Sequence, residues 1–202
     1  MNEISAKTRF FLEHRVQIME WARLENVAAA DVHRWFAGWS EPMSERPPEP
    51  DAMLWDETSG SSYVQLLWYR PSWQPLPGAR PSVGLGFEWN AGRPIGATSP
   101  FCGIRVGGGS ETPAGAALWD ALRERVLRVP DLAPHGKNKW WPVMFGVDSG
   151  ILGAMTAGPL FASEGSEDPL EPRMEAFRER CFEAAYKLWS ELADAVDEVM
   201  GV

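Results

Sequence analysis

Glu88 is the residue whose sequence neighbourhood points most directly to chemistry. It lies in residues 82–90, where large apolar side chains alternate with small ones. Because successive residues of a strand point to opposite faces, Glu88 shares one face with Gly84 and Gly86, and these glycines let a backbone or a ligand approach closely. Arg105, on the next expected strand, could oppose Glu88. The two would then form either a cross-strand ion pair or part of a metal and phosphate site.

The other groups that could carry catalysis do not cluster in the sequence. The three histidines are far apart, and none has a second histidine three or four positions away, so we expect no metal site and no resident cofactor. Cys102 and Cys181 lie in apolar segments and are interpreted as small buried hydrophobes. The three glycines at 107–109 precede an expected helix and could form an anion nest. Without the lysine of a phosphate-binding loop, they favour a simple turn.

Tryptophan is abundant, with eleven residues in a chain of 202. Most lie on expected apolar stripes and fill the core by default. Trp140 and Trp141 are adjacent in an expected strand and point to opposite faces. Either helices therefore cover both faces of the sheet, or one of the two is exposed for a partner. Trp73, in a proline-rich turn, is a second candidate for exposure. Because tryptophan is enriched at interface hot spots, all three are candidate binding residues.

The net charge of −9 is unevenly distributed. Residues 1–57 hold 6 Lys/Arg against 11 Asp/Glu, residues 58–147 hold 9 against 5, and residues 148–202 hold 4 against 12. An acidic total disfavours unspecific binding of nucleic acid, although residues 58–147 could bind one locally. The acidic flanks favour a basic protein partner. No apolar run approaches 18 residues and the N-terminus lacks the order of a secretion signal, so we expect a cytoplasmic protein without membrane association.

The hydrophobic pattern predicts one domain over residues 1–202. Helices are expected over 3–24, 32–39, 113–129 and 172–200, and strands over 61–70, 82–90, 101–106 and 139–147. The connections include an acidic, proline-rich loop (40–60) and a loop rich in glycine, serine and proline (148–171). Pro142 indicates that the fourth strand is an edge strand or begins late.

The lengths of the connections predict how the strands pair. The first three strands lack room for crossover helices and should form an antiparallel meander. The helix before the fourth strand allows a parallel pair with a right-handed crossover. We therefore predict an α+β fold with one four-stranded mixed sheet in αβββαβ order, on which the N-terminal helices and the long C-terminal helix pack.

This order of elements resembles the core of the PD-(D/E)XK nuclease-like superfamily over roughly residues 3–147, through the segments GLGFEW, FCGIRV and KWWPVMF. The resemblance implies an acidic residue near the second strand and an acid-x-Lys motif on the third, which together bind Mg²⁺. Glu88 matches the acidic position, but the motif position reads Gly103-Ile104-Arg105. A second register, with Glu88-Trp89-Asn90 as the motif and Gln65 on the preceding strand, also lacks the lysine. The resemblance therefore implies an inactive copy, because Arg cannot act like a tuned Lys.

Three functions follow from these observations. The leading hypothesis is a non-catalytic interaction protein, such as an inhibitor or immunity protein, that binds a basic protein or a nucleic-acid enzyme. The first alternative is a divergent Mg²⁺-dependent nuclease with Glu88, Arg105 and Gln65 as candidate catalytic residues. The second alternative is a small-molecule or anion-binding domain that uses the glycine-rich segments.

Overall fold

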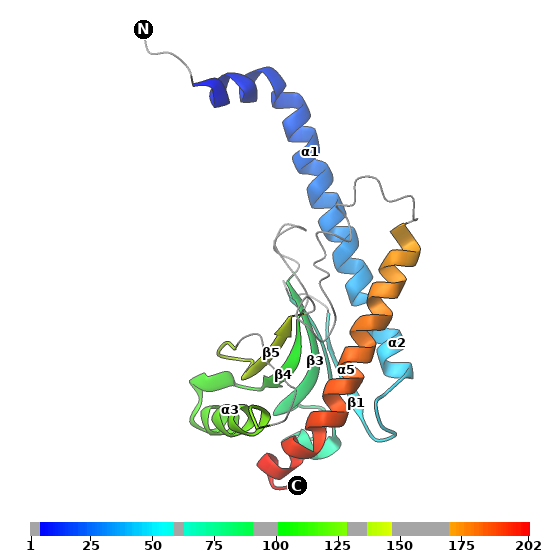
Figure 1. Cartoon of the computed structure of the whole chain (residues 1–202), viewed down its shortest axis with the longest axis vertical. Helices are drawn as coiled ribbons and strands as arrows, with labels where there is room; N and C mark the ends of the chain where they lie inside the picture. The colour runs from blue at the N-terminus through cyan, green and yellow to red at the C-terminus, as the bar shows by residue number, and fades with distance from the viewer. Residues whose placement is uncertain (1–4, 59–62, 91–100, 129–136, 147–169) are drawn as a thin grey trace.

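The computed structural model describes residues 5–58, 63–90, 101–128, 137–146 and 170–202. The described elements, shown in Figure 1, are α1 (Ala6–Ala37), α2 (Ser40–Glu45), β1 (Met53–Glu57), β2 (Tyr63–Tyr69), the 3-10 helix η1 (Pro71–Trp73), β3 (Val83–Asn90), β4 (Phe101–Val106), the 3-10 helix η3 (Gly109–Glu111), α3 (Pro113–Val126), β5 (Val143–Gly146) and α5 (Leu170–Met200). The predicted α+β class is confirmed, with the N-terminal helices and α5 packed on one sheet.

The sheet has five described strands in the order β1-β2-β3-β4-β5, and every neighbouring pair is antiparallel. The prediction of a four-stranded mixed sheet is therefore wrong in two respects, the extra strand β1 and the direction of β5. The direction of β5 follows from where the chain returns after α3. The Val106 amide donates to the Trp140 carbonyl at 2.9 Å, which anchors the returning chain at the end of β4. From there β5 can only run back alongside β4. As Pro142 indicated, β5 is an edge strand that begins at Val143.

The two N-terminal helices predicted from the sequence are one continuous helix, α1. Ser5 caps its start by accepting a hydrogen bond from the Thr8 amide at 3.2 Å. Asp31 pairs with Arg34 inside α1 and does not cap the start of a second helix. The run of three alanines at 28–30 carries the helix through this region, because alanine has the highest helix propensity.

Residues 40–60 are not the single loop that their prolines and acids predicted. Met43 in α2 is completely buried, and its carbonyl accepts a hydrogen bond from Trp68 Nε1 at 3.1 Å. The prolines at 47, 48 and 50 lie between α2 and β1, where proline interrupts neither element. The loop predicted over 148–171 lies outside the described residues as far as 169, and its last two residues begin α5.

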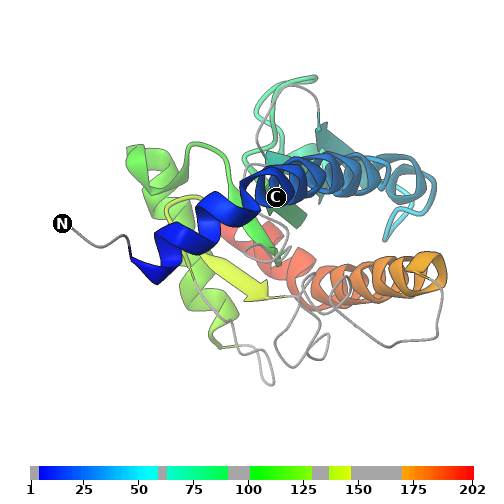
Figure 2. The same ribbon diagram turned by 90° about the horizontal axis from the view of Figure 1, so that it is seen from above.

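The aromatic core lies between the helices and one face of the sheet. The Phe36 ring of α1 stacks on Trp89 of β3 with centroids 4.0 Å apart. Phe182 of α5 lies 6.5 Å from Phe87 on the same face of β3. In the view from above, α1 and α5 run alongside each other (Figure 2). The apolar stripe predicted for the last helix is therefore the surface that closes the core.

The helix predicted over 113–129 is α3, which begins at Pro113 and ends three residues earlier than predicted, at Val126. Thr112 accepts a hydrogen bond from the Gly115 amide at 3.1 Å, and Pro113 occupies the first turn. Beyond the sheet, the N-terminal half of α1 extends away from the rest of the chain (Figure 1). None of the helices in the described segments combines the length and the apolar character needed to cross a membrane.

Candidate functional site

A cleft of about 450 Å³ lies on the face of the sheet opposite α1 and α5. Its charged and amide-bearing walls are formed by Glu57, Gln65, Arg80, Glu88, Arg105 and Lys139. The strand register explains why three of these meet, because Glu57 pairs with Gln65 and Gln65 pairs with Glu88 across β1, β2 and β3. Paired residues of neighbouring strands point to the same face, so the three polar side chains form a row.

A chain of hydrogen bonds links the polar row to a loop arginine. Arg80 donates to Gln65 Oε1 and pairs with Glu57 at 2.5 Å. Gln65 Nε2 donates to Glu88 Oε2 at 2.5 Å, and Trp141 Nε1 donates to the same oxygen at 3.3 Å. Glu88 Oε2 therefore accepts two hydrogen bonds from neutral donors, which fixes the orientation of the carboxylate.

Glu88 is only 8% exposed, and this burial raises the pKa of its carboxyl above the usual value. The hydrogen bonds from Trp141 and Gln65 oppose the shift, and the positive charges of Arg105 and Arg80 oppose it further. Burial thus dominates, because it disfavours the charged form more than these partners favour it.

Arg105 is the most unusual side chain of the cleft. It is 6% exposed, and burial together with the nearby charge of Arg80 lowers the pKa of Arg105 to about 10. Its guanidinium lies 5.3 Å from the centroid of the Trp140 ring. Its Nε has no hydrogen-bond partner among the described residues. A buried arginine normally binds a carboxylate or a phosphate through its forked donors.

The residues predicted from strand alternation largely meet in this cleft. Gln65, Glu88, Arg105 and Trp140 line it, and Trp141 contacts Glu88. The expected opposition of Glu88 and Arg105 is wrong, since Arg105 pairs with Gly84 and Glu88 pairs with the first residue of β4. The two side chains share a face but lie four residues apart along the sheet.

Trp73 and Trp141 are both completely buried. The exposure predicted for Trp73 is wrong, because the proline-rich turn folds back so that Trp73 Nε1 donates to Asp197 of α5 at 2.6 Å. Trp140 is half-buried and remains accessible from the cleft. The adjacent pair at 140 and 141 thus splits into one buried and one partly exposed ring.

Sequence reasoning missed the loop residues of the cleft. Arg80 follows Gly78, whose φ of 77° closes the turn before β3. Asn138 Oδ1 accepts the backbone amides of Trp140 and Trp141 at 2.8 and 3.0 Å, and so holds the Trp140 turn at the cleft. A turn-forming asparagine before two aromatic residues was the available signal.

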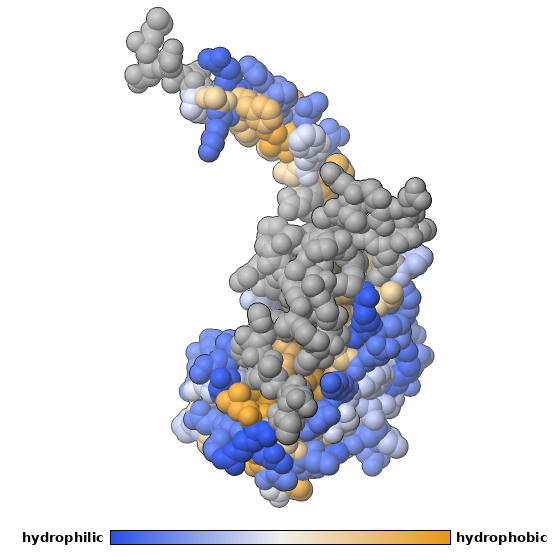
Figure 3. Space-filling view, viewed as in Figure 1, coloured by the Kyte–Doolittle hydropathy of each residue, from blue (hydrophilic) through white to orange (hydrophobic). Residues whose placement is uncertain are grey.

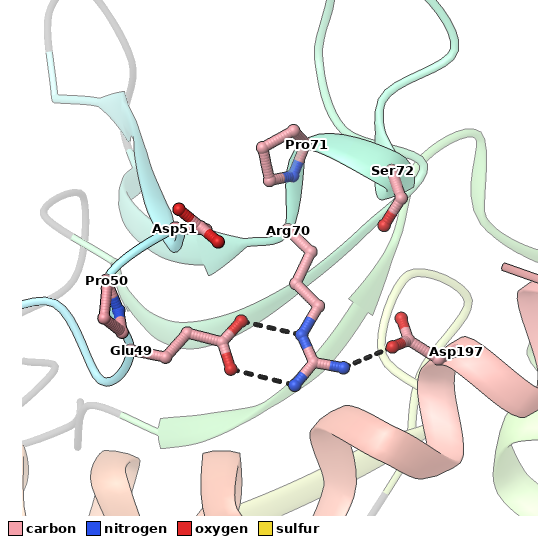
Figure 4. A pocket seen from close by; sticks show the side chains of 7 residues that line it. All are labelled: Glu49, Pro50, Asp51, Arg70, Pro71, Ser72 and Asp197. Carbon is pink, nitrogen blue, oxygen red and sulfur yellow. Dashed lines mark hydrogen bonds and ion pairs between the residues drawn. The ribbon is translucent and has the colours of Figure 1, made fainter.

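A second, larger pocket of about 610 Å³ lies around Arg70 (Figure 4). Arg70 donates to both oxygens of Glu49, at 2.7 and 2.8 Å, and also pairs with Asp197. The hydrogen bonds from Arg70 lower the pKa of Glu49. Because its cation already has three carboxylate partners, Glu49, Asp194 and Asp197, this pocket serves to fasten residues 49–51 and the end of β2 to α5.

The glycine-rich turn after β4 is occupied by backbone contacts. The Gly107 amide donates to the Ser82 carbonyl at 2.7 Å, and the Ser110 amide donates to the Lys139 carbonyl at 2.7 Å. Gly109 has a φ of 58°, and a Cβ there would lie 2.5 Å from the Lys139 carbonyl oxygen. These contacts agree with the interpretation as a turn that lets the chain before β5 pass closely.

The described residues contain no group of three or more histidine, cysteine, aspartate or glutamate side chains placed to hold a metal ion. Comparisons of the chain with models of protein families, with characterised proteins and with solved structures find no match.

Proposed function

We propose that this chain is a non-catalytic interaction protein that docks onto a basic partner protein through the N-terminal half of α1. The observation that carries the proposal is the concentration of exposed apolar side chains on this helix. Large apolar residues of α1 that are exposed are Phe10, Phe11, Leu12, Val16, Met19, Trp21, Leu24 and Val27. Figure 3 shows this apolar surface on the extended part of the molecule.

The apolar residues lie on more than one side of the helix. Leu12, Val16 and Met19 follow each other at spacings of four and three, which places them on one stripe. Phe10 and Trp21 are eleven residues apart, about three turns, and share another side. A helix that is apolar on several sides is normally enclosed, so a partner groove that takes up the helix fits this surface better than a flat contact.

The charge next to the helix supports a basic partner. Phe177 of α5 packs against Trp35 of α1 with ring centroids 6.3 Å apart, so the first turns of α5 lie beside the C-terminal part of the helix that carries the docking surface. Glu171 and Glu175 of these turns are exposed. Within a chain of net charge −9, they favour a partner groove flanked by lysine or arginine.

The test is binding to the partner captured from the native host and then purified. Trp21→Ala and Met19→Ala, one on each side of the helix, should each weaken binding about tenfold or more, as expected for hot-spot residues. Leu76→Ala is the matched control, because Leu76 is 69% exposed and lies far from α1 in the sequence. Rising salt should weaken binding to a basic partner.

Three results would contradict this proposal. They are unchanged affinity in both α1 variants, an equal loss in Leu76→Ala, and a dimer of the chain itself that dissociates in the α1 variants. Light scattering across a concentration series distinguishes the last result, since a second copy would then be the occupant of the helix.

A metal-dependent nuclease is the second candidate, favoured by one observation. Glu57 and Glu88 both line the cleft beside Arg105, and hydrolysis with Mg²⁺ needs more than one carboxylate. The residues described supply two acids separated by Gln65. Mn²⁺-dependent cleavage of DNA or RNA that Glu88→Ala removes would support this function, and the absence of both cleavage and calorimetric metal binding would reject it.

A further inference from the structure

Among the described residues, no acidic side chain forms an ion pair or a hydrogen bond with Arg105, whose Nε is buried without a partner. Its side chain borders the cleft, and the nearest acids of the wall already have donors. Glu57 pairs with Arg80, and Glu88 accepts hydrogen bonds from Gln65 and Trp141. Keeping an arginine that is only 6% exposed without such a partner is costly, because no carboxylate of the described residues replaces the hydration that its buried Nε has lost.

We propose that the cleft is a binding site for a carboxylate and that Arg105 is the residue that recognises it. The guanidinium offers parallel donors that match the two oxygens of a carboxylate. Trp140, against which the guanidinium lies, provides an aromatic wall for the group that carries the carboxylate. This site is independent of the docking surface on α1, which lies beyond the opposite face of the sheet.

Two further donors stand at the cleft. Asn138 Oδ1 accepts two backbone amides, which leaves its Nδ2 as the end of the side chain that can donate to a ligand. Lys139 Nζ lies 5.3 Å from the Trp140 centroid and 3.0 Å from Glu111 Oε1 at the exposed rim. A ligand oxygen could thus receive hydrogen bonds from Arg105 and Asn138 together, in a cavity large enough for a small molecule or an inserted side chain.

The acids of the wall select a singly charged ligand. Glu57 and Glu88 face the same space as Arg105, so a dianionic phosphate would be repelled by two carboxylates. A carboxylate carries one negative charge and loses less to this repulsion. The same chemistry can come from a free carboxylic acid or from a glutamate side chain of a polypeptide, and suitable probes separate these two sources.

The test is calorimetric titration at pH 7 and constant ionic strength. Benzoate is compared with benzamide, and N-acetylglutamic acid amide with N-acetylglutamine amide, so that each carboxylate has a neutral counterpart of the same shape. We expect at least one carboxylate to bind about tenfold or more tightly than its neutral counterpart, as for a charge-assisted hydrogen-bonded pair. The tighter of the two acids identifies the source, and inorganic phosphate should bind more weakly than either.

Substitutions of Arg105 test whether this residue is responsible for carboxylate binding. Arg105→Met should reduce the carboxylate affinity about tenfold or more. It should leave the melting temperature of the empty protein unchanged or higher, because it removes a buried charge without a direct partner. Arg105→Lys keeps the charge but loses the fork and should bind less tightly than the original chain. Arg125→Met removes an exposed arginine that pairs with Glu198 and should bind as the original chain does.

The inference is overturned if neither carboxylate binds more tightly than its neutral counterpart, if Arg105→Met and Arg105→Lys both bind as the original chain does, or if phosphate binds more tightly than both acids. If Arg105→Met does not fold, the decision falls to Arg105→Lys, whose unchanged affinity would count against the inference. A loss of stability in a folded Arg105→Met protein would also contradict it, because Arg105 would then be a structural residue.

Discussion

Two arginine–glutamate pairs, each joined by two hydrogen bonds, differ in burial, and so allow the effect of burial on stability to be tested. Arg70 donates to Glu49 at 2.7 and 2.8 Å, and Arg46 donates to Glu179 at 3.0 and 3.1 Å, each through two nitrogens. The side chains of the first pair are 21% and 26% exposed, and those of the second are 46% and 43% exposed. Arg70 also pairs with Asp197.

Arg70→Met would leave two partly buried carboxylates without their cation. Removing one partner of a fully buried pair costs about 3–5 kcal/mol, and the remaining solvent contact here reduces the cost to about 2–3 kcal/mol. Arg46→Met removes an exposed pair and should cost about 0.5 kcal/mol. For a chain of this size, the melting temperature should fall by about 4–12 °C in Arg70→Met and by about 2 °C or less in Arg46→Met.

Urea unfolding followed by tryptophan fluorescence measures both variants. Because Arg70 lowers the pKa of Glu49 in the folded state, the stabilisation is present above the unfolded pKa of about 4.3 and is lost as the pH falls through the folded value. The gap between the original chain and Arg70→Met should therefore shrink in acid. The reasoning is refuted if Arg70→Met loses no more stability at pH 7 than Arg46→Met.

Three further outcomes follow from burial and close contact. Burial raises the pKa of Glu88, so folding favours its protonated form and the original chain loses stability as the carboxyl ionises at higher pH. The melting temperature of Glu88→Gln relative to that of the original chain should therefore increase from pH 4 to pH 8. Gly86→Ala should cost about 3 kcal/mol in urea unfolding, because its Cβ would lie 2.0 Å from a backbone oxygen. Gly84→Ala should cost less than Gly86→Ala, because the nearest atom to its Cβ would be the side-chain Cβ of Leu67 at 2.9 Å. Burial raises the pKa of Cys102 to about 12 and also that of Cys181, so neither thiol should react with Ellman's reagent at pH 8 until urea unfolds the chain.

The sequence predicted the elements whose signals are local. Alternation marked β3, and Thr112 with Pro113 marked the start of α3, because caps and alternation depend on neighbouring residues only. β1 was hidden by the acids and prolines around it, and its pairing with β2 is a tertiary contact. The direction of β5 depends on the hydrogen bond between the Val106 amide and the Trp140 carbonyl, which no local pattern encodes.

The residues of the candidate cleft also divide into those that a local pattern predicted and those that depend on tertiary contacts. Glu88 and Arg105 were found because strand alternation placed them on the face with few large side chains. Arg80 was missed because a turn brings it to the cleft, and Glu57 was missed because it lies on β1, a strand that the sequence did not predict. Trp73 was misjudged because a proline-rich turn indicates a surface loop, while its packing against α5 depends on Asp197, more than a hundred residues away.

The order of the strands has a consequence for how the chain is made. Each described strand pairs with its neighbour in the sequence, so the sheet can grow strand by strand as residues emerge from the ribosome. The helical cover forms later, because Trp73 and Arg70 contact Asp197 of α5, which is more than a hundred residues further along the sequence. During translation, the nascent sheet therefore carries an aromatic face that only α1 and α2 can cover until α5 has emerged, and this interval is when chaperone binding or aggregation competes with folding.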